Sequence, residues 1–245
     1  MNDFPPIVHL APVAEAGFPD IISPVIFTPL CNFKCRYCLN TDVVKNTIEK
    51  RWSFEEICEY MEKHEEEYIL ISGGEPCIHS NIENLVSALH EKGYKVRIST
   101  NGSYPEKIRG MIDKGILSFV AQDIKTSPSK IGLFRELIAN EKHAPSVKEK
   151  LLESIQMLNE LVGHETFTFE FRTTLDPRYV KEEDIREIAS FIHPESIWFL
   201  QQFRARKGLL GGDHMADVNP YDDDTLDSFL KIARSVVPNA FMRWP

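Results

Sequence analysis

Residues 31–38 read Cys-Asn-Phe-Lys-Cys-Arg-Tyr-Cys, so three cysteines follow the spacing C-x3-C-x2-C. Thiolates are soft ligands that suit zinc, copper(I) and iron–sulfur clusters, and a closed zinc or cluster site takes four protein ligands. Cys31, Cys35 and Cys38 supply only three. If they hold a [4Fe-4S] cluster, one iron keeps an open position, and open metal positions are where substrates bind and react.

Two other interpretations of the cysteine triplet remain open at this point. Free cysteine is among the most buried residue types, so three core cysteines can fall at this spacing by chance. A zinc site with a distant fourth ligand such as His79 is also compatible with the sequence. The remaining cysteines, Cys58 and Cys77, lie too far along the chain to complete a compact knuckle. Cys58 falls on the apolar stripe of a predicted helix, so we expect it in the core.

Length and composition indicate one large domain over residues 1–245. The chain is 42% hydrophobic, which suits a substantial core. Its net charge of −9 argues against a nucleic-acid partner, because binding to phosphates depends on clustered lysine and arginine. The first positively charged residue is Lys34, and no apolar run reaches the ~18 residues of a membrane span. We therefore expect a cytoplasmic protein with no membrane partner.

Short apolar runs alternate with helical patterns six times along the chain. Strict strand–helix alternation predicts a parallel sheet covered by helices. Eight such units would close a barrel and six leave it incomplete, so the expected fold is α/β, a partial (β/α)6 TIM-like barrel. The predicted strands are 25–30, 68–72, 94–99, 117–122, 167–174 and 197–203.

Two segments without a predicted strand or helix, and two predicted helix starts, complete the expected organisation. Residues 1–24 contain five prolines and are expected to form an extended N-terminal lead-in. Residues 126–146 are polar and long for a connection, which makes them a candidate lid or insertion. Two capping boxes are predicted to begin helices, and they pair Ser53 with Glu56 and Ser80 with Glu83.

The strand predicted at 167–174 alternates phenylalanines with polar residues. Its phenylalanines should pack under the helices, and its polar side chains should point into the barrel. A charge inside the barrel is costly unless a ligand or a partner meets it. The polar residues of this strand are Thr168, Glu170, Arg172 and Thr174.

Gly73, Gly74, Glu75 and Pro76 directly follow the second predicted strand. Glycines let the backbone approach a ligand closely, and exposed carbonyls with the Glu75 carboxylate could accept hydrogen bonds from an ammonium group. A simple glycine turn or a weak phosphate cradle is the alternative. The carboxyl ends of successive parallel strands carry active sites in barrels, so this loop and the cysteine loop should lie together.

These motifs resemble the radical S-adenosylmethionine (SAM) superfamily. The cysteine spacing, an aromatic residue before the third cysteine (Tyr37) and a Gly-Gly-Glu-Pro loop are typical of its members. The resemblance implies a [4Fe-4S] cluster held by Cys31, Cys35 and Cys38, with SAM on the open iron. It also implies reductive cleavage of SAM to methionine and a 5′-deoxyadenosyl radical.

Two further motifs resemble the glycyl-radical-enzyme activases within that superfamily. They are Ser99-Thr100-Asn101-Gly102 and Asp123-Ile124-Lys125, at the ends of the third and fourth predicted strands. The resemblance implies that they contact SAM or a monovalent cation: Lys125 would pair with the methionine carboxylate, and Asp123 with the ribose or the cation. Ser99 stands where the activases have aspartate, which puts the cation site in doubt. Asp123 and Lys125 could instead form a solvated ion pair.

Three more stretches resemble the activators of anaerobic ribonucleotide reductase. They are residues 17–20, 171–174 and 200–204, and they imply that Arg172 faces SAM while Gln202 and Phe203 line the cofactor or substrate side. The chain departs from the activase pattern at Leu39, where histidine is usual, and at Cys77, where threonine is common. Cys77 is then either an inert apolar side chain or a thiol near the cofactor.

The resemblance implies an activase that removes a hydrogen atom from a glycine of a partner glycyl radical enzyme, in particular anaerobic ribonucleotide reductase. A flavodoxin- or ferredoxin-type protein would supply the electron. A second hypothesis keeps the cofactors but changes the substrate to a small molecule, as in 7-carboxy-7-deazaguanine synthase. A third hypothesis is a non-catalytic cluster or zinc protein.

Overall fold

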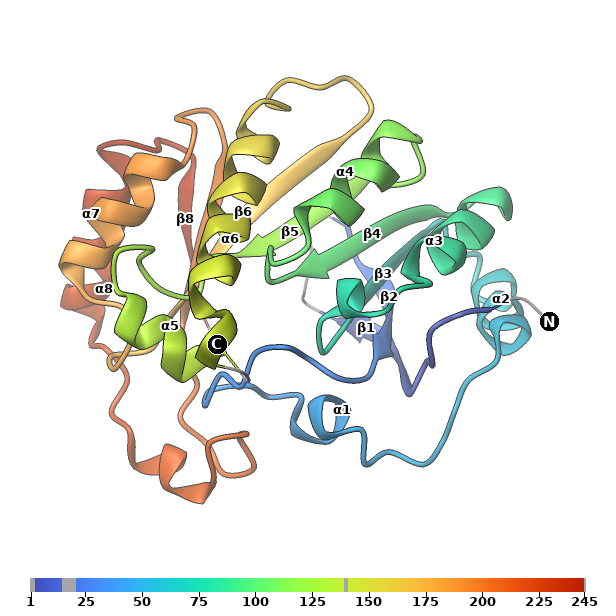
Figure 1. The fold of residues 1–245 in the computed structure, drawn as a ribbon, viewed down its shortest axis with the longest axis horizontal. Helices are drawn as coiled ribbons and strands as arrows, with labels where there is room; N and C mark the ends of the chain where they lie inside the picture. The colour runs from blue at the N-terminus through green and yellow to red at the C-terminus, as the bar shows by residue number, and fades with distance from the viewer. Residues whose placement is uncertain (1–2, 15–20, 139–140, 245) are drawn as a thin grey trace.

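One eight-stranded sheet forms the centre of the protein (Figure 1). The structure is a computed structural model, and it describes residues 3–14, 21–138 and 141–244. The strands lie in the order of the sequence, and they are β1 (His9–Ala14), β2 (Ser23–Thr28), β3 (Tyr68–Gly73), β4 (Lys95–Thr100), β5 (Phe119–Asp123), β6 (Thr168–Leu175), β7 (Ile197–Gln202) and β8 (Ala240–Arg243).

Strands β2 to β8 run parallel, and β1 pairs antiparallel with β2. Within the described residues no pairing joins β1 to β8, so the sheet stays open. The fold is a partial TIM-like barrel, which confirms the predicted fold class.

Two edge strands escaped prediction. β1 lies inside the segment expected to be an extended lead-in. Pro12 is tolerated there because the outer side of an edge strand makes no hydrogen bonds to a neighbouring strand. β8 has only four residues and no alternating pattern long enough to detect. The motif predicted at 17–20 lies outside the described residues.

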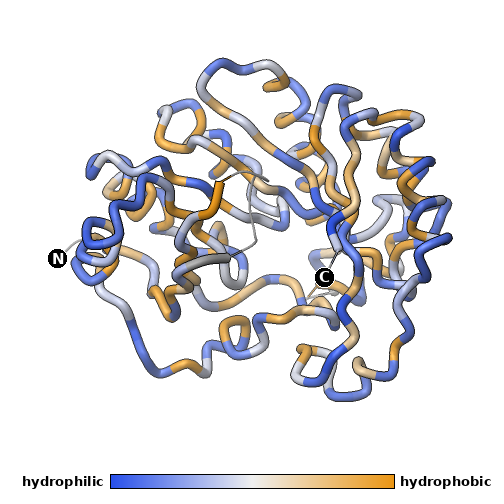
Figure 2. Tube along the Cα trace, turned by 180° about the vertical axis from the view of Figure 1, so that it is seen from behind, coloured by the Kyte–Doolittle hydropathy of each residue, from blue (hydrophilic) through white to orange (hydrophobic). Residues whose placement is uncertain are grey.

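The helices lie outside the sheet (Figure 1). They are α1 (Thr41–Lys45), α2 (Phe54–Lys63), α3 (Ile82–Glu91), α4 (Pro105–Asp113), α5 (Ile131–Leu137), α6 (Ala144–Asn159), α7 (Glu182–Phe191) and α8 (Asp223–Arg234). Figure 2 shows hydrophobic and hydrophilic residues alternating along them, as expected for helices with one face on a sheet.

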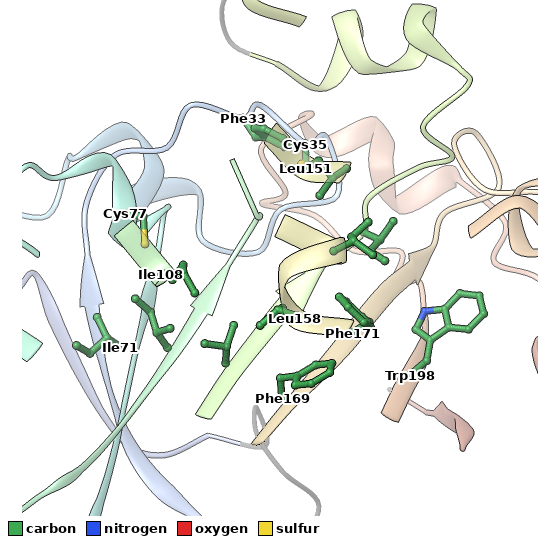
Figure 3. Close-up of a cluster of buried hydrophobic side chains, with 14 of the residues drawn as sticks. Phe33, Cys35, Ile71, Cys77, Ile108, Leu151, Leu158, Phe169, Phe171 and Trp198 are labelled. Carbon is green, nitrogen blue, oxygen red and sulfur yellow. The ribbon is translucent and has the colours of Figure 1, made fainter. Parts of the chain in front are cut away.

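Side chains between helices and sheet form the main core. Phe169 and Phe171 of β6 lie beside Leu158 of α6 in Figure 3, and all three are at least nine-tenths buried. The predicted outward packing of the β6 phenylalanines is therefore confirmed. Glu170 and Arg172 alternate with them and so face the other side of the sheet.

One of the two predicted capping boxes is present. At the start of α2, the Glu56 backbone N–H donates to Ser53 Oγ (3.1 Å), and the Ser53 N–H donates to Glu56 Oε2 (2.7 Å). The second prediction is wrong, because α3 begins at Ile82 with Asn81 as its N-cap, and that cap makes no side-chain hydrogen bond. The chain turns at residues 80 and 81, so Ser80 lies one position too early.

The segment 126–146 contains the helix α5 and a 3₁₀ turn, Glu141–His143. Its end packs on the cysteine loop: the Lys34 N–H donates to the Leu137 carbonyl (2.6 Å), and Phe33 forms a β-bridge with Ile138. Phe134, Leu137 and Ile138 are buried. The segment thus forms one wall beside the cysteine loop, and its role as a lid stays a prediction.

Candidate active site

A cavity of about 500 Å³ opens at the carboxyl ends of the strands. A volume of this size lies within the range of about 300–1,000 Å³ that single small ligands occupy. Most residues predicted for the site line it, and they come from loops far apart in sequence: Cys31, Cys35, Tyr37, Cys38, Gly73, Gly74, Ser99, Thr100, Asn101, Asp123, Lys125, Arg172, Gln202 and Phe203. Glu75 and Pro76 are not part of this lining.

Cys31, Cys35 and Cys38 all line the cavity, and their burial disfavours the charged thiolate form. Burial raises the pKa of the Cys35 thiol to about 11 and holds that of Cys31 above its usual range. Binding of a metal must therefore displace protons from these thiols. The Phe33 N–H donates to Cys31 Sγ (3.3 Å), and Asn101 Nδ2 lies 3.9 Å from the same sulfur. Donors of this kind orient cluster sulfurs and tune the metal.

The donors around the cavity show no site for a single ion among the residues that the structure describes. Zinc needs four donors within about 2.3 Å of one point. In the part of the chain that the structure describes, no three His, Cys, Asp or Glu side chains come that close together. His79, the suggested fourth zinc ligand, places its ring nitrogen Nε2 2.8 Å from the Pro29 carbonyl oxygen. Three thiols that line one cavity without converging on a single ion are compatible with a larger iron–sulfur body.

Gly73 and Gly74 hold the loop after β3 against the cysteine loop. The Gly74 N–H donates to the Thr28 carbonyl, and the Glu75 N–H donates to the Leu30 carbonyl, both over 2.9 Å. A Cβ on Gly74 would lie 1.7 Å from the Leu30 carbonyl oxygen, and Gly73 has φ of +118°. The glycines are therefore needed for contact between two backbones, in addition to any contact with a ligand.

The Glu75 carboxylate points into the protein, away from the cavity. It is fully buried and accepts hydrogen bonds from the Cys77 N–H (3.0 Å), the Asn101 N–H (2.6 Å) and Thr100 Oγ1 (2.9 Å). Burial raises the pKa of Glu75, and these hydrogen bonds oppose that rise. Glu75 thus ties the loop after β3 to the loop after β4.

We expect Glu75→Gln to destabilise the protein by about 1–3 kcal/mol, because the amide nitrogen would face a buried donor that needs an acceptor. Urea unfolding monitored by circular dichroism measures the change. Glu83→Gln is the matched control: it removes the same charge from an exposed pair with Lys114, which contributes less than about 1 kcal/mol. Equal stability losses in the two variants would contradict the bracing role of Glu75.

Asp123 and Lys125 form an ion pair at the cavity wall. Lys125 Nζ lies 2.6 Å from Asp123 Oδ2, and each side chain is about three-quarters buried or more. Burial opposes the charge of Lys125, but attraction to Asp123 and Cys35 outweighs it and raises the pKa of Lys125. The pair is therefore partly buried beside the cysteines, unlike the solvated pair considered from the sequence.

Arg172 brings a buried positive charge to the lining of the cavity. Its side chain is 7% exposed, and its Nε donates to Glu170 Oε1 (2.5 Å). Among the described residues, Arg172 Nη2 has no hydrogen-bond partner. A buried guanidinium group favours an acceptor, so this nitrogen is available to an anionic group in the cavity.

The carboxamide of Gln202 is anchored at one end. Its Nε2 donates to the Tyr221 carbonyl (2.9 Å), while its Oε1 has no hydrogen-bond partner among the described residues. Phe203 is 1% exposed and lies beside Arg178, 5.9 Å from ring centroid to guanidinium carbon. Gln202 therefore offers an acceptor at the site, and Phe203 supplies apolar surface.

Several cavity residues were missed as site residues from the sequence. Thr174 was expected to face the barrel, and it does line the cavity. Ser72 could have been found from the same alternation in β3. Arg243 and Trp244 had no detectable signal, because they belong to or follow the short strand β8.

Cys58 and Cys77 lie in the core, away from the cavity. Cys58 is 6% exposed on α2, as predicted. Cys77 is fully buried and lies near Ile108 in Figure 3, and burial raises its pKa well above the usual range. Buried thiols of this kind are inert and behave as small apolar side chains.

The structure combines an open α/β barrel with three cysteines in the loop after β2, the first of its parallel strands. These features define a class of enzymes that use a metal cluster together with a small cofactor. The sequence matches the radical SAM superfamily over residues 25–192, and the chain belongs to that superfamily. It therefore uses a [4Fe-4S] cluster and SAM. The residues present fit these groups, because three thiols line a cavity of suitable size.

Similar proteins include one from Methanocaldococcus jannaschii, provisionally named glycyl-radical enzyme activating enzyme MJ1227. It is 29% identical over 234 residues, which cover 94% of this chain and 92% of that protein. The 7-carboxy-7-deazaguanine synthase of Haemophilus influenzae is 34% identical over 107 residues, covering 41% of this chain and 48% of the synthase.

Among solved structures, SuiB of Streptococcus suis bound to S-adenosylmethionine superposes with a TM-score of 0.57 at 16% identity. The match covers 90% of this chain and 51% of SuiB, so this chain spans about half of SuiB. This likeness supports the fold. Within the described residues, no helix is both long enough and apolar enough to cross a membrane.

Proposed function

We propose that this protein is a glycyl-radical-enzyme activase, which removes a hydrogen atom from a glycine of a partner enzyme, with anaerobic ribonucleotide reductase as the expected partner. The observation that carries the proposal is similarity over nearly the whole chain to a protein named for this activity. The reduced cluster, when bound, supplies the electron that cleaves SAM to a 5′-deoxyadenosyl radical.

The chain's own residues bind and orient the cofactors. Cys31, Cys35 and Cys38 would hold the cluster. The carbonyls of the loop after β3 and the amide of Gln202 offer acceptors for the SAM ammonium group. Lys125 and Arg172 offer donors for its carboxylate. These roles follow from which groups line the cavity, and they are part of the proposal.

The open side of the barrel suits a macromolecular substrate. The described parts of β1 and β8 do not pair, and Leu39 and Trp244, both 51% exposed, line the cavity. Exposed apolar residues at the entrance of a site favour contact with a partner surface. A glycine-bearing loop could therefore reach the cavity without a large opening movement.

The test is anaerobic incubation of the reconstituted protein with SAM, a reductant and the candidate reductase, followed by electron paramagnetic resonance. We expect a glycyl radical doublet on the reductase and 5′-deoxyadenosine in solution. The control is a reductase variant with alanine at the radical glycine, which should give no doublet. Cleavage of SAM without any doublet would contradict the activase proposal and leave the cofactor chemistry intact.

A second candidate is a radical SAM enzyme that acts on a small anionic molecule. The local similarity to 7-carboxy-7-deazaguanine synthase and the positive side chains Arg172, Arg204 and Arg243 at the cavity favour it. In that case a carboxylate-bearing small molecule, and not the reductase, would stimulate SAM cleavage.

A further inference from the structure

Glu170 is a carboxylate that lies inside the barrel without reaching the cavity. It is fully buried and is not part of the cavity lining, whereas Arg172, two residues further along β6, does line it. Residues two apart on a strand face the same side of the sheet. On β5, Glu170 pairs with Ala121, and Arg172 pairs with Asp123 at the carboxyl end of that strand. Glu170 therefore lies next to Arg172 on the inner side of the sheet, one step further from the cavity.

One hydrogen bond joins the two side chains and fixes the direction of the guanidinium group. Arg172 Nε donates to Glu170 Oε1 over 2.5 Å. Among the described residues, neither Arg172 Nη2 nor Glu170 Oε2 has a hydrogen-bond partner. A guanidinium group is planar, and its donors form a rigid fork. Holding Nε on the carboxylate therefore limits the directions in which Nη2 can point.

A second buried arginine makes this hold more important. Arg97 is 1% exposed, and its guanidinium carbon lies 4.5 Å from the centre of the Phe119 ring. Burial lowers the pKa of Arg97, attraction to Glu170 opposes that change, and repulsion from Arg172 adds to it. Arg97 and Arg172 thus repel each other inside the barrel, where water screens charges weakly. Glu170 offsets this repulsion and holds Arg172 in place.

The other end of Arg172 suits a carboxylate. A buried N–H without an acceptor costs free energy, and a guanidinium group binds carboxylates in a defined geometry. The methionine part of SAM carries one carboxylate. Lys125, the other donor suggested for it, already pairs with Asp123 over 2.6 Å. Arg172 Nη2 has no such partner among the described residues, so it is the better placed of the two donors.

We propose that Glu170 is a positioning residue for SAM: by holding Arg172 Nε, it presents Arg172 Nη2 to the SAM carboxylate. Glu170 thereby sets the preference of the site for ligands that carry a carboxylate. This inference rests on the proposed contact between Arg172 and SAM, and it is independent of which substrate the radical attacks. Glu170 does not line the cavity, so it acts through Arg172.

The test measures the dissociation constants of SAM and of decarboxylated SAM, an analogue with hydrogen in place of the carboxylate. Both are measured on the reconstituted protein without a reductant, so that SAM is not cleaved and the values report binding alone. The ratio of the two constants is the preference for the carboxylate. Arg172→Leu should lower this preference about 10-fold, because a charge-assisted hydrogen bond is lost.

Two conservative variants separate the reach of Glu170 from its charge. Glu170→Asp keeps the charge but shortens the side chain by one methylene, so the bond to Arg172 breaks or the guanidinium group follows the carboxylate away from the cavity. We expect the preference to fall about 10-fold in this variant. Glu170→Gln keeps an oxygen that can reach Nε, and should stay within about 3-fold of the wild type. The affinity for decarboxylated SAM should change less than about 2-fold in both variants.

A double variant and a control complete the experiment. Glu170→Asp combined with Arg172→Leu should lose no more preference than Arg172→Leu alone, because residues that act through one contact are not additive. Asp184→Asn is the matched control. Asp184 is also fully buried and pairs with Lys130 over 2.8 Å, but neither residue lines the cavity. This variant should keep the wild-type preference.

Three results would overturn the proposal. Equal weakening of both ligands in Glu170→Asp would indicate damage to the fold. An unchanged preference in Glu170→Asp or in Arg172→Leu would show that this pair does not meet the carboxylate. A further loss in the double variant would show that Glu170 acts by another route. None of these results bears on the activase proposal, which is tested by the glycyl radical on the partner enzyme.

Discussion

Replacing Cys35 by alanine is expected to abolish SAM cleavage, with a loss of more than about 100-fold. Changes to residues that only support metal ligands already cost about 10–100-fold, and Cys35 would be a ligand itself. It is 6% exposed and lines the cavity. Iron content after anaerobic reconstitution and the amount of 5′-deoxyadenosine formed are the two measurements.

Cys58→Ala is the matched control for this substitution. Cys58 is also 6% exposed, and it lies on α2 in the core. The two variants lose the same sulfur atom from equally buried positions, so their losses of apolar contact should be similar. Cys58→Ala should keep its iron and its activity. An active Cys35→Ala variant with full iron content would show that this thiol is not a cluster ligand.

The second large effect is expected for Gly74→Ala. Its Cβ would overlap the Leu30 carbonyl oxygen at 1.7 Å, and backbone atoms cannot rotate away as a side chain can. The loop after β3 would then separate from the cysteine loop. Overpacking in a tight site costs about 1–3 kcal/mol or more, so we expect a loss of about 3 kcal/mol and lower iron content. Chemical unfolding and iron analysis measure the two effects.

Gly110→Ala controls for the added methyl group. Gly110 lies within α4, and its Cβ would meet no atom within 4 Å. Alanine is favoured over glycine inside a helix by about 0.5–1 kcal/mol, so this variant should be slightly more stable than the wild type. An equal free energy of unfolding for Gly74→Ala and Gly110→Ala would contradict the claim that the close contact between Gly74 and Leu30 holds the loop after β3 against the cysteine loop.

The sequence predicted the central part of the fold because its signals are local. Six apolar runs alternate with helical stripes, and parallel strands joined by helices bring their carboxyl ends to one edge. That rule alone placed the cysteine loop beside the motifs at 73–76, 99–102 and 123–125. The edge strands β1 and β8 could not be predicted in this way, because one contains proline and the other has four residues.

Side-chain directions in the loops were harder to predict than the positions of the loops. Glu75 was expected to face a ligand, but its carboxylate instead accepts hydrogen bonds from the Asn101 N–H and Thr100 Oγ1 at the end of β4. Arg243 reaches the cavity from a strand that pairs with β7 and follows it by some forty residues in the chain. Contacts of this kind depend on the assembled sheet and leave no local pattern.

The most direct test of the account is an electron paramagnetic resonance spectrum of the reconstituted, reduced protein before and after SAM is added. The account holds that three cysteines leave one iron open for SAM, so the spectrum of the reduced [4Fe-4S] cluster should change when SAM binds. A spectrum that SAM leaves unchanged, at full iron content and saturating SAM, would contradict it.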